Sequence, residues 1–450
     1  MRRRVAELAT ILGAHFTGTG DVLVTGAATD SRSVRSGDLF VALPGARVDG
    51  HTFVSQAAAN GAAAALVDRQ VDAALPQILV ADTVAALQTL ARHERDHAGF
   101  RVVALTGSIG KTTTKEMLVA LLGSVFPVGF TRGNRNSEIG FPAELCSQPA
   151  GIDWMVAELG MSHPGELHRL GAIAHPDVLL YTVVAPVHLE FFPDLEAIAE
   201  AKAELIPHLH PDGILVLNAA DPRVAAFDRR FAGRVVRHGL PERSDYWLTG
   251  IVSEGLLGSR FSLCGHGFEQ PVRLPLPGRH QADNLLAAAA TAITLGLSPF
   301  QAAEAAAALR SAPRRGEVHR LRDGITLFDD SYNASPLAMI RVLEMLAATP
   351  GRRVAVLGEM LELGPTAPAL HREVGEAAGR AADVVLAVGP EHAADLASGA
   401  GDRCVRHVPD AATALELLGP LVRPGDVVLV KGSRGIGLDR VVDSLLEERR

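Results

Sequence analysis

The stretch that decides the fold is RVVALTGSIGKTTTKEM, residues 101–117. It begins with an apolar run, Val102 to Leu105, that is typical of a buried strand, and it continues through a glycine turn into a helical pattern. Strand, turn, Gly-Lys-Thr and helix in this order indicate a phosphate-binding loop, because backbone N–H groups and a helix N-terminus attract phosphate. The alternative is a plain surface turn. We predict a nucleotide site, with the lysine and threonine side chains reaching phosphate and Mg²⁺. Its residues would be Gly107, Ser108, Gly110, Lys111, Thr112 and Thr113.

The composition is that of a folded protein with several domains. The chain has 450 residues, which corresponds to about three domains of the usual size. Hydrophobic residues make up 48% and charged residues 21%, which excludes a disordered chain. The formal net charge of -8 argues against nucleic acid or an anionic membrane as a partner, and it allows local basic pockets for phosphate.

The cysteines and the N-terminus indicate the compartment. Cys146, Cys264 and Cys404 are widely spaced and odd in number, so they form neither a disulfide framework nor a zinc pattern. The apolar residues of MRRRVAELATILGAHF are interrupted by Glu7 and His15, which predicts a short amphipathic helix rather than a signal sequence. No apolar run approaches the roughly 20 residues that a bilayer requires. We therefore expect a cytoplasmic protein without membrane insertion.

Three α/β units follow one another along the chain. Residues 1–98 alternate short strands with alanine-rich helices and end at the Gly99-Phe100 break. Residues 99–312 have a βαβ pattern that implies a mainly parallel sheet, with an antiparallel edge over 246–276. Residues 313–450 restart the pattern as a Rossmann-like unit without its glycine fingerprint. The expected strands are 38–43, 63–67, 78–80, 102–106, 154–159, 178–184, 214–218, 326–329, 353–357, 384–388 and 427–430, and the expected helices are 54–61, 84–97, 195–206, 284–295 and 299–309.

Two side chains follow strands of the central unit, at the edge where an α/β sheet places its ligands. Glu158 ends a strand in AELG, and His188 follows the next strand in APVHLE. Together with the Thr112 hydroxyl they could hold a divalent ion on the terminal phosphate. Taken singly, Glu158 is an ordinary strand-end acid and His188 a surface or core histidine. For Lys202, whose helix is otherwise acidic, the residues alone favour an exposed side chain that pairs with Glu200 or Glu204.

Polar loops supply further candidate residues, each of which could instead be an ordinary turn residue without a role in binding. Asn136 lies in a loop after a strand of the central unit, and Asn284 at a helix start is placed for an N-cap or for reading a base. Arg315 lies on the junction where closing domains could bring an arginine to ATP. Similar polar segments follow strands at residues 29–32, 49–53, 329–336 and 430–435.

A series of motifs resembles the ATP-dependent Mur ligases of peptidoglycan synthesis along nearly the whole chain. The motifs are TDSR with SGDLFVAL and DGHTF, TGSIGKTTTKEM, GNRNSEIG, AELGMSHPGE, HLEFF, GRHQADN, DDSYNASP, VLGEMLELG and LVKGSRGIGLDRVV. The GKTT loop is shared with folylpolyglutamate synthases, whereas DDSYNASP, VLGEMLELG and KGSRG are the specific parts. The Asp-Asn-Pro-Arg motif of the sibling that adds the third peptide residue is absent from the sequence, which argues for the branch that adds D-alanyl-D-alanine.

The resemblance implies an architecture and an activity. A central P-loop ATPase-like domain would be flanked by an N-terminal UDP-binding domain and a C-terminal Rossmann-like domain for the dipeptide. ATP would phosphorylate the terminal carboxylate of UDP-N-acetylmuramoyl-tripeptide, and the amine of D-alanyl-D-alanine would attack the acyl phosphate. Both partners are small molecules, and we expect a monomer whose outer domains close on the central one. The alternatives are a sibling Mur ligase for another amino acid, a folylpolyglutamate-type ligase and a non-catalytic nucleotide-binding scaffold.

The resemblance also assigns residues. Lys111 would stabilise the transferred phosphoryl group, Thr112 and Glu158 would bind one Mg²⁺, and His188 with a carbamylated Lys202 would bind a second. The ATP contacts would be Asn284, Arg315 and Asp330. Uridine diphosphate would lie near Asp30, Ser31, Arg32 and His51. The sugar-peptide, the dipeptide and the closed site would involve Asn136, Ser162, His163, Asn333, Ser335, Lys431, Ser433 and Arg434.

The sequence departs from common patterns at a few positions. Leu105 stands where the strict G-x-x-x-x-G-K-[ST] pattern has its first glycine, and a glycine at Gly107 instead is a mark of this family. Ser335 and Ser162 stand where the family often has asparagine. The shorter serine hydroxyl weakens the assignment of Ser335 to the dipeptide pocket. Gln281 replaces a common asparagine beside His280 and leaves Asn284 as the base-reading candidate.

Overall fold

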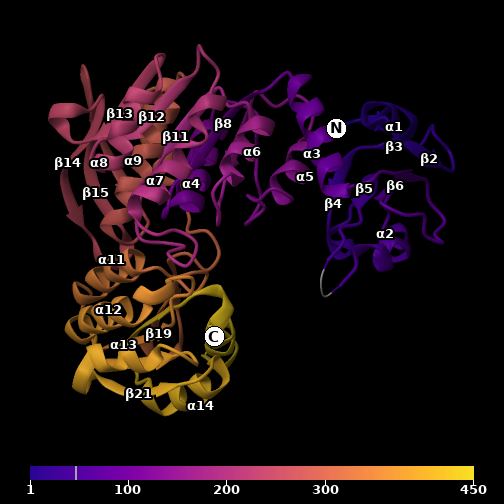
Figure 1. The fold of residues 1–450 in the computed structure, drawn as a ribbon. Helices are drawn as coiled ribbons and strands as arrows, with labels where there is room; N and C mark the ends of the chain where they lie inside the picture. The colour runs from indigo at the N-terminus through magenta and orange to yellow at the C-terminus, as the bar shows by residue number, and fades with distance from the viewer. Residues whose placement is uncertain (46–47, 450) are drawn as a thin grey trace.

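Each of three α/β domains is built on its own sheet in the computed structural model, which describes residues 1–45 and 48–449 (Figure 1). We call them the N-terminal, central and C-terminal domains. Their sheets lie within residues 15–79, 101–274 and 317–431. The predicted fold class, a mainly parallel central sheet flanked by two smaller α/β domains, is confirmed. We keep residues 98–99 and 312–313 as proposed domain boundaries.

The N-terminal domain has a five-stranded sheet with the order β2-β7-β6-β5-β4. Its strands are parallel except for the edge strand β2, and β1 and β3 form a separate antiparallel ribbon. The longest helix, α3, begins where Asp82 accepts hydrogen bonds from the N–H groups of Val84 and Ala85. The elements are β1 (Arg3–Arg4), α1 (Val5–Leu12), β2 (His15–Thr17), β3 (Leu23–Val24), β4 (Gly26–Ala28), β5 (Asp38–Val41), α2 (Val54–Ala59), β6 (Ala64–Val67), β7 (Gln77–Leu79) and α3 (Thr83–Asp96).

The central domain has a nine-stranded sheet with the order β16-β15-β14-β13-β12-β11-β8-β10-β9. Strands β8 to β14 are parallel, and the apolar residues of β8, β10 and β11 are buried on both faces, as is usual for a parallel sheet covered by helices. The strands are β8 (Arg101–Thr106), β9 (Val128–Phe130), β10 (Trp154–Glu158), β11 (Val178–Tyr181), β12 (Ile214–Asn218), β13 (Arg234–Gly239), β14 (Tyr246–Ser253), β15 (Ser259–Gly265) and β16 (Phe268–Leu274). The helices are α4 (Lys111–Gly123), α5 (Gly140–Cys146), α6 (Glu166–Ala174), α7 (Leu195–Ala203), α8 (Pro222–Ala225), α9 (Arg279–Thr294) and α10 (Pro299–Ala307).

The structure confirms the antiparallel edge and corrects two predicted elements. Strands β14, β15 and β16 pair antiparallel over residues 246–274. Strand β11 ends at Tyr181 rather than at residue 184, because the next residues bind the phosphate loop: the Ser108 N–H donates to the Val183 carbonyl at 2.7 Å. Helix α9 begins at Arg279, after the left-handed Gly278, so the expectation that Asn284 starts the helix or caps it is wrong.

The C-terminal domain has a six-stranded sheet with the order β17-β18-β22-β19-β20-β21, parallel except for the edge strand β17. Apolar clusters fill both faces of the sheet and belong to this domain alone, apart from Leu256, which packs at the margin of one of them. The elements are β17 (Glu317–Arg320), β18 (Thr326–Asp329), α11 (Pro336–Ala347), β19 (Arg353–Gly358), α12 (Ala367–Ala381), β20 (Val384–Val388), α13 (Ala393–Ala400), β21 (Cys404–Val408), α14 (Ala411–Leu421), β22 (Val427–Lys431) and α15 (Asp439–Arg449).

The N-terminal and central domains share one hydrophobic core. Leu87 and Leu90 of α3 belong to the same buried cluster as Phe141 of α5 and Leu167 of α6. The N-terminal ammonium group donates to the Cys146 carbonyl at 2.7 Å. These contacts fix the N-terminal domain on the central one.

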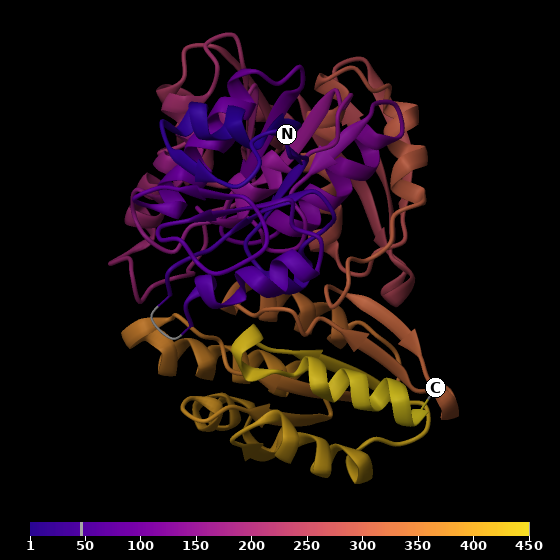
Figure 2. The ribbon, with the colours of Figure 1, turned by 90° about the vertical axis from the view of Figure 1, so that its right-hand side faces the viewer.

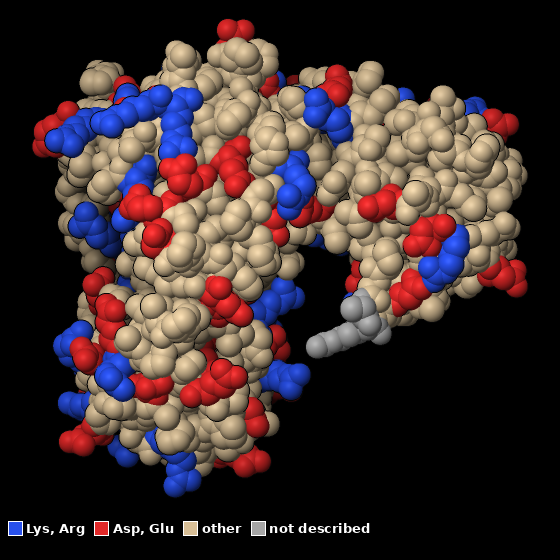
Figure 3. All heavy atoms as spheres, viewed as in Figure 1, with Lys and Arg blue, Asp and Glu red and all other residues tan. Residues whose placement is uncertain are grey.

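The central domain lies at the corner of an L-shaped molecule (Figure 1). In the view of Figure 2 the N-terminal domain lies in front of the central domain, and the C-terminal domain lies below both. On the face shown in Figure 3, a deep hollow separates the N-terminal and C-terminal domains. No helix among residues 1–45 and 48–449 is both long and apolar enough to span a bilayer.

Candidate active site

The phosphate loop connects β8 to α4 at the carboxyl edge of the central sheet. At Gly110 φ is +80°, and an added Cβ would lie 2.5 Å from the Asn284 Oδ1. At Gly107 an added Cβ would lie 1.9 Å from the Thr182 Oγ1. Both positions therefore require glycine, one for its left-handed backbone and both for the close approach of a neighbouring side chain.

Lys111 and Thr112 open helix α4 directly behind this loop. The Lys111 Nζ donates to the carbonyls of Gly107 at 2.8 Å and Ser108 at 3.1 Å, so the ammonium group lies over the loop. Burial lowers the pKa of Lys111, and the nearby Glu158 carboxylate partly opposes this shift. Thr112 is buried on the same turn and lines the cavity described below.

Glu158 ends β10 and is 2% exposed. Its Oε1 accepts a hydrogen bond from the Asn136 Nδ2 at 2.7 Å, whereas its Oε2 is buried and has no hydrogen-bond partner among the residues that the structure describes. A buried carboxylate oxygen without a donor is destabilising, and a bound cation would satisfy it. This oxygen fits the predicted divalent ion.

His188 has a left-handed backbone, with φ +57°, on the segment that follows β11. Its Nδ1 hydrogen bonds to the Oε2 of Glu362, a residue of the C-terminal domain. This contact holds the pKa of Glu362 below its usual value. The imidazole Nε2 is left as the nitrogen that could bind an ion.

Lys202 lies in α7 and is 2% exposed, so the hypothesis of an exposed lysine is wrong. Its acidic neighbours have other partners: Glu200 pairs with Arg230, and Glu204 accepts from the Gly165 N–H at 2.8 Å. Burial lowers the pKa of Lys202 to well below its usual value, and the positive charge of Lys111 lowers it further. Burial of this kind favours the uncharged amine, which is the form that reacts with carbon dioxide.

The residues assigned to ATP lie on both sides of the junction between the central and C-terminal domains. Asn284 is inside α9 and donates to the Gln281 Oε1 at 3.3 Å. The Arg315 guanidinium lies over the Tyr332 ring, 3.9 Å from its centroid. Asp330 is paired with Lys431 at 2.6 Å, between the ends of β18 and β22.

The residues assigned to the dipeptide and the sugar-peptide are held by backbone contacts. The Lys431 Nζ also donates to the Asn333 carbonyl at 2.9 Å. Ser433 accepts from the Leu361 N–H at 3.0 Å through its hydroxyl. The Ser162 N–H donates to the Glu166 Oε2 at 2.7 Å, and that of His163 donates to the same oxygen at 3.2 Å. Two further members of this group have other surroundings: Ser335 precedes α11, and the Arg434 guanidinium lies 5.6 Å from the Tyr332 ring centroid.

One cavity of roughly 540 Å³ brings most of these residues together. It lies between the central and C-terminal domains. The predicted residues that line it are Ser108, Gly110, Lys111, Thr112, Thr113, Asn136, Glu158, Ser162, His188, Asn284, Arg315, Asp330, Asn333, Ser335, Lys431, Ser433 and Arg434. The predicted residues outside its lining are Gly107, His163, Lys202 and the four of the N-terminal domain, Asp30, Ser31, Arg32 and His51.

The four N-terminal residues lie on the polar loops that follow β4 and β5. Asp30 accepts from Arg32 at 2.7 Å, and these hydrogen bonds lower the pKa of Asp30 to about 2. The Ser31 hydroxyl donates to Gln56 at 2.9 Å. His51 is buried, with its Nδ1 2.7 Å from Asp49 and its Nε2 3.0 Å from Asp68. In this structure His51 therefore supports its own loop.

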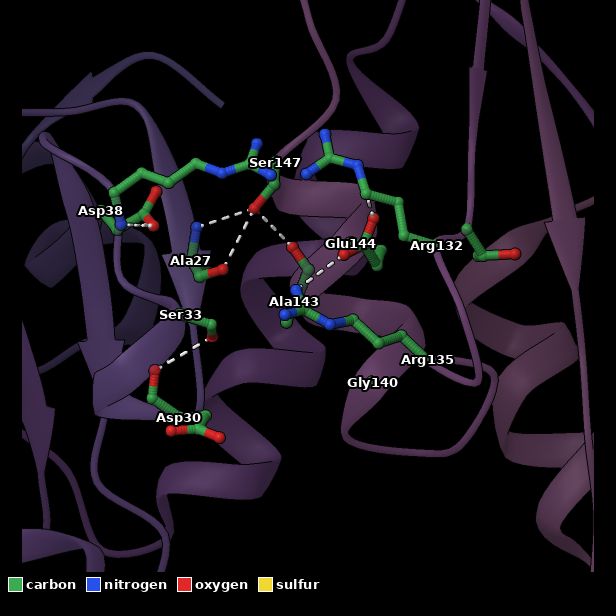
Figure 4. Close-up of polar contacts among 12 residues, drawn as sticks. Ala27, Asp30, Ser33, Asp38, Arg132, Arg135, Gly140, Ala143, Glu144 and Ser147 are labelled. Atoms are coloured by element: carbon green, nitrogen blue, oxygen red, sulfur yellow. Dashed lines mark hydrogen bonds and ion pairs between the residues drawn. The ribbon is translucent and has the colours of Figure 1, made fainter. Parts of the chain in front are cut away.

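Arg132 and Arg135 of the central domain lie across the junction from Asp30 and Asp38 of the N-terminal domain (Figure 4). Arg135 donates to the Oε1 of the buried Glu144 at 2.8 Å, and Arg132 lies 3.9 Å from its Oε2. Nearby, the Ser147 hydroxyl accepts from the Ala27 N–H at 2.9 Å and joins α5 to β4. After the hydrogen bonds with Arg32, the charge of Arg135 also lowers the pKa of Asp30 across the junction of the two domains.

A second group of possible metal ligands lies at the start of the C-terminal domain. Ligand atoms of Glu317, His319 and Asp329 lie within 4.8 Å of one another. The guanidinium of Arg314 already lies 3.8 Å from Asp329, and the Arg314 N–H donates to Glu317 at 2.7 Å. Asp329 already has a cation nearby and Glu317 already has a backbone donor, so these acids give no reason to add a metal ion.

Sequence reasoning missed several residues of the site, and three of them carry polar side chains that the structure brings close to the predicted ones. Glu362, Tyr332 and Glu166 all line the cavity. Each lies inside a motif that the resemblance used, namely VLGEMLELG, DDSYNASP and AELGMSHPGE. The motif was the available signal, but nothing in the sequence tells which of its side chains turns toward the cavity.

Comparisons with known proteins give matches along most of the chain. The profile described as "Mur ligase family, catalytic domain" matches residues 23–95, "Mur ligase middle domain" matches 105–292, and "Mur ligase, glutamate ligase domain" matches 314–434. The UDP-N-acetylmuramoyl-tripeptide-D-alanyl-D-alanine ligase of Escherichia coli K12 is 38% identical over 449 residues, which cover 98% of each chain.

Solved structures match over nearly the same extent. A crystal structure of MurF from Acinetobacter baumannii has a TM-score of 0.90 and 31% identity, with 99% of each chain covered. A MurF ligase from Thermotoga maritima in complex with ADP has a TM-score of 0.81 and 33% identity, with 94% of this chain and 98% of that chain covered.

Proposed function

Since the chain belongs to the Mur ligase family, we propose that it joins D-alanyl-D-alanine to UDP-N-acetylmuramoyl-tripeptide, with ATP as the third substrate. It is an ATP-dependent ligase of peptidoglycan synthesis, and its product is the UDP-linked pentapeptide. The observation that carries the proposal is the cavity in which the phosphate loop and Glu158 face the polar loops of the C-terminal domain. There the three reactants can meet.

The reaction has two chemical steps. An oxygen of the tripeptide's terminal carboxylate attacks the γ-phosphorus of ATP, which gives an acyl phosphate and releases ADP. The dipeptide amine then attacks the acyl carbon, and the tetrahedral intermediate expels phosphate as the nitrogen loses its proton. The product is an amide.

Residues of the phosphate loop would stabilise the first step. The Lys111 ammonium can move from its carbonyl partners to the transferred phosphoryl group, where it offsets the developing negative charge. Asn284, which touches Gly110, would contact the nucleotide from α9. Arg315 and Asp330 would reach it from the C-terminal domain once ATP competes with their present partners, Tyr332 and Lys431.

Two Mg²⁺ ions are part of the proposal. Thr112 and Glu158 would hold one, and the unpartnered Oε2 of Glu158 supports this assignment. His188 and a carbamylated Lys202 would hold the other. The uncharged Lys202 amine would combine with carbon dioxide, lose one proton and become an anionic ligand. When bound, the ions neutralise phosphate charge and orient the reacting oxygens.

The substrates would enter from both outer domains. We assign uridine diphosphate to the loops of Asp30, Ser31, Arg32 and His51, close to Arg135. Asn136, Ser162 and His163 would face the sugar-peptide. The dipeptide would bind near Asn333 and the turn of Lys431, Ser433 and Arg434, with Ser335 as the least supported member.

We infer a monomer as the active form. We place the enzyme in the cytoplasm, where ATP and UDP-linked precursors are available. Neither statement affects the chemistry above.

The test is an acceptor assay with the purified full-length chain. ATP, Mg²⁺, UDP-N-acetylmuramoyl-tripeptide and D-alanyl-D-alanine should give the pentapeptide and one phosphate per amide formed. Single amino acids and a folate substrate with glutamate serve as competing acceptors. Turnover with one of these and none with the dipeptide would refute the proposed acceptor, and ATP binding without any turnover would favour a scaffold.

A further inference from the structure

Two residues from different domains meet at the rim of the cavity. His188 belongs to the central domain, and Glu362 lies 174 positions later, on the loop that follows β19 in the C-terminal domain. The Nδ1 of His188 and the Oε2 of Glu362 form a hydrogen bond, and both residues line the cavity. The assigned roles above leave Glu362 without a function.

The backbone on both sides is shaped for this contact. The φ angle is +57° at His188 and +64° at Glu362, a region that residues other than glycine seldom adopt. Such conformations are strained and persist where the surroundings enforce them. The Glu190 N–H also donates to the Glu362 carbonyl at 3.3 Å. The two segments are therefore joined by side-chain and backbone hydrogen bonds.

The close fit of the two segments continues at Gly364. An added Cβ there would lie 3.1 Å from the Leu189 carbonyl oxygen and from the Glu190 Cα, and φ at Gly364 is +53°. A larger residue would push the loop of Glu362 away from His188. The glycine thus lets the C-terminal domain approach the central one at this point.

The loop of Glu362 is fixed within its own domain. The Leu361 N–H donates to the Ser433 hydroxyl at 3.0 Å, and the Met360 N–H donates to the His371 Nε2 at 2.9 Å. The Ser433 N–H donates to the Glu359 carbonyl at 3.0 Å. The carboxylate of Glu362 therefore moves with the C-terminal domain and with the turn that contains Ser433.

The hydrogen bond decides which imidazole nitrogen is free. When Nδ1–H donates to a carboxylate, the lone pair is on Nε2, and the ring is held in one orientation. Histidines that bind metal ions usually have such a partner, and its loss typically reduces metal affinity or activity by about 10- to 100-fold. Glu362 offers this partner from across a domain junction.

We propose that Glu362 is a positioning residue that fixes the tautomer and orientation of His188, so that the second metal site is completed only when the C-terminal domain is docked. The proposal rests on the proposed function in one respect, the use of His188 as a ligand. It adds a reason why phosphoryl transfer would wait for the domain that carries the dipeptide.

The variants are Glu362→Ala, Glu362→Gln and, as the matched control, Glu190→Ala. Glu190 lies on the same junction but its exposed side chain does not contact His188. Gln can still accept from Nδ1–H through its amide oxygen, so it should rescue part of the effect. All three changes lie at a junction rather than in a core, and circular dichroism will verify that each variant is folded.

The first readout does not depend on activity. Nitrogen NMR of the ligand-free chain with labelled histidine, assigned with a His188→Gln variant, reports the tautomer. We expect Nδ1–H in the wild type and in Glu190→Ala, and a shift toward Nε2–H in Glu362→Ala. An unchanged His188 signal in Glu362→Ala would overturn the proposal, whatever the enzyme's acceptor is.

The second readout is the Mg²⁺ dependence of pentapeptide formation. Glu362→Ala should need about tenfold more Mg²⁺ for half-maximal rate and lose about 10- to 100-fold in kcat, with the KM for ATP little changed. The Mg²⁺ requirement and the kcat of Glu362→Gln should lie between those of the wild type and those of Glu362→Ala. A wild-type Mg²⁺ profile in Glu362→Ala would overturn the proposal, whereas an inactive wild type would count against the proposed function and leave the NMR test decisive.

Discussion

Lys111 is the cation nearest to the expected position of the transferred phosphoryl group. Its two present partners are carbonyls of the phosphate loop, which ATP would replace. Lys111→Ala should therefore reduce ATP-dependent phosphate release by at least about 100-fold, the usual cost of removing one donor to a developing charge. Malachite-green detection of phosphate measures the rate, and calorimetric titration with ADP shows whether binding survives. A rate within about threefold of wild type would contradict the assignment.

Lys202 provides a different test, because its role requires a chemical modification. Lys202→Ala should lose most of the activity and regain part of it when acetate or propionate is added, since a small carboxylate can take the place of the carbamate. Glu200→Ala, two residues earlier and exposed on the same helix, is the matched control. Carbon NMR of the wild type in labelled bicarbonate should show a carbamate signal that Lys202→Ala lacks. Full activity of Lys202→Ala would remove the carbamate from the mechanism.

At the residue scale, the sequence predicted types of side chain better than their environment. Local charges made Lys202 look exposed, because the burial of α7 depends on long-range packing against the central sheet. Glu362 was missed for the same reason, since its partner is 174 positions away. In contrast, Lys111 and Thr112 could be placed from spacing alone, because the loop and the first turn of the helix are local structures.

The phosphate loop is the element on which the nucleotide site depends. Gly110→Ala forces an L-residue into φ +80° and places its Cβ 2.5 Å from the Asn284 Oδ1. We expect ADP affinity to fall by at least about tenfold, which corresponds to about 1.4 kcal/mol. In an Asn284→Ala background the same change should cost less, because only the backbone strain remains. A double-mutant cycle by calorimetry measures the difference, and strict additivity would argue against the clash.

Elements with a strong pattern were predictable, whereas some of the short elements were not. The apolar strands β8, β10, β12 and β19 and the helix α3 were found close to their true bounds. Strand β9 and helix α5 were missed, because three or seven residues carry little periodicity. The end of β11 was misplaced because the Ser108 N–H binds the backbone that follows Tyr181. The start of α9 was misplaced because the chain turns at Gly278, directly before Arg279.

The stability of the whole molecule depends on pH, and His238 shows in which direction it changes. Burial in β13 lowers the pKa of His238 to about 4, and its Nε2 has no hydrogen-bond partner within residues 1–45 and 48–449. The unfolded chain, with an ordinary pKa near 6.5, takes up the proton first, so stability is lost as pH falls from about 6.5 toward 4. For this group alone the loss between pH 7.5 and pH 5 is about 2 kcal/mol.

His238→Phe should therefore lose less thermal stability between pH 7.5 and pH 5 than the wild type does. Differential scanning fluorimetry at both pH values measures the two midpoints. His266→Phe, which changes an exposed histidine, should behave like the wild type. Other titrating groups are common to all three chains and cancel in the comparison. Equal pH shifts in His238→Phe and the wild type would show that His238 is not buried in its neutral form.

The sequence led us to expect closure of both outer domains, but the arrangement of the hydrophobic cores differs between the two domains. The N-terminal domain shares a hydrophobic cluster with the central domain through α3, α5 and α6, so that its rotation would expose apolar surface to water. The C-terminal domain has its own two cores. Its connection to the central domain includes left-handed backbone at Arg314 and Gly316. We expect the C-terminal domain alone to move.

Fluorescence transfer can separate the two motions. With a donor at Phe300→Cys in the central domain, acceptors go to Val405→Cys in the C-terminal domain or to Phe16→Cys in the N-terminal domain, all exposed positions. Cys404→Ser removes the half-buried native thiol. An ATP analogue with the UDP-linked tripeptide should change transfer to position 405 and leave transfer to position 16 constant. If position 16 responds as strongly, the shared core does not act as a rigid joint, and the peptide would be delivered by the N-terminal domain as well.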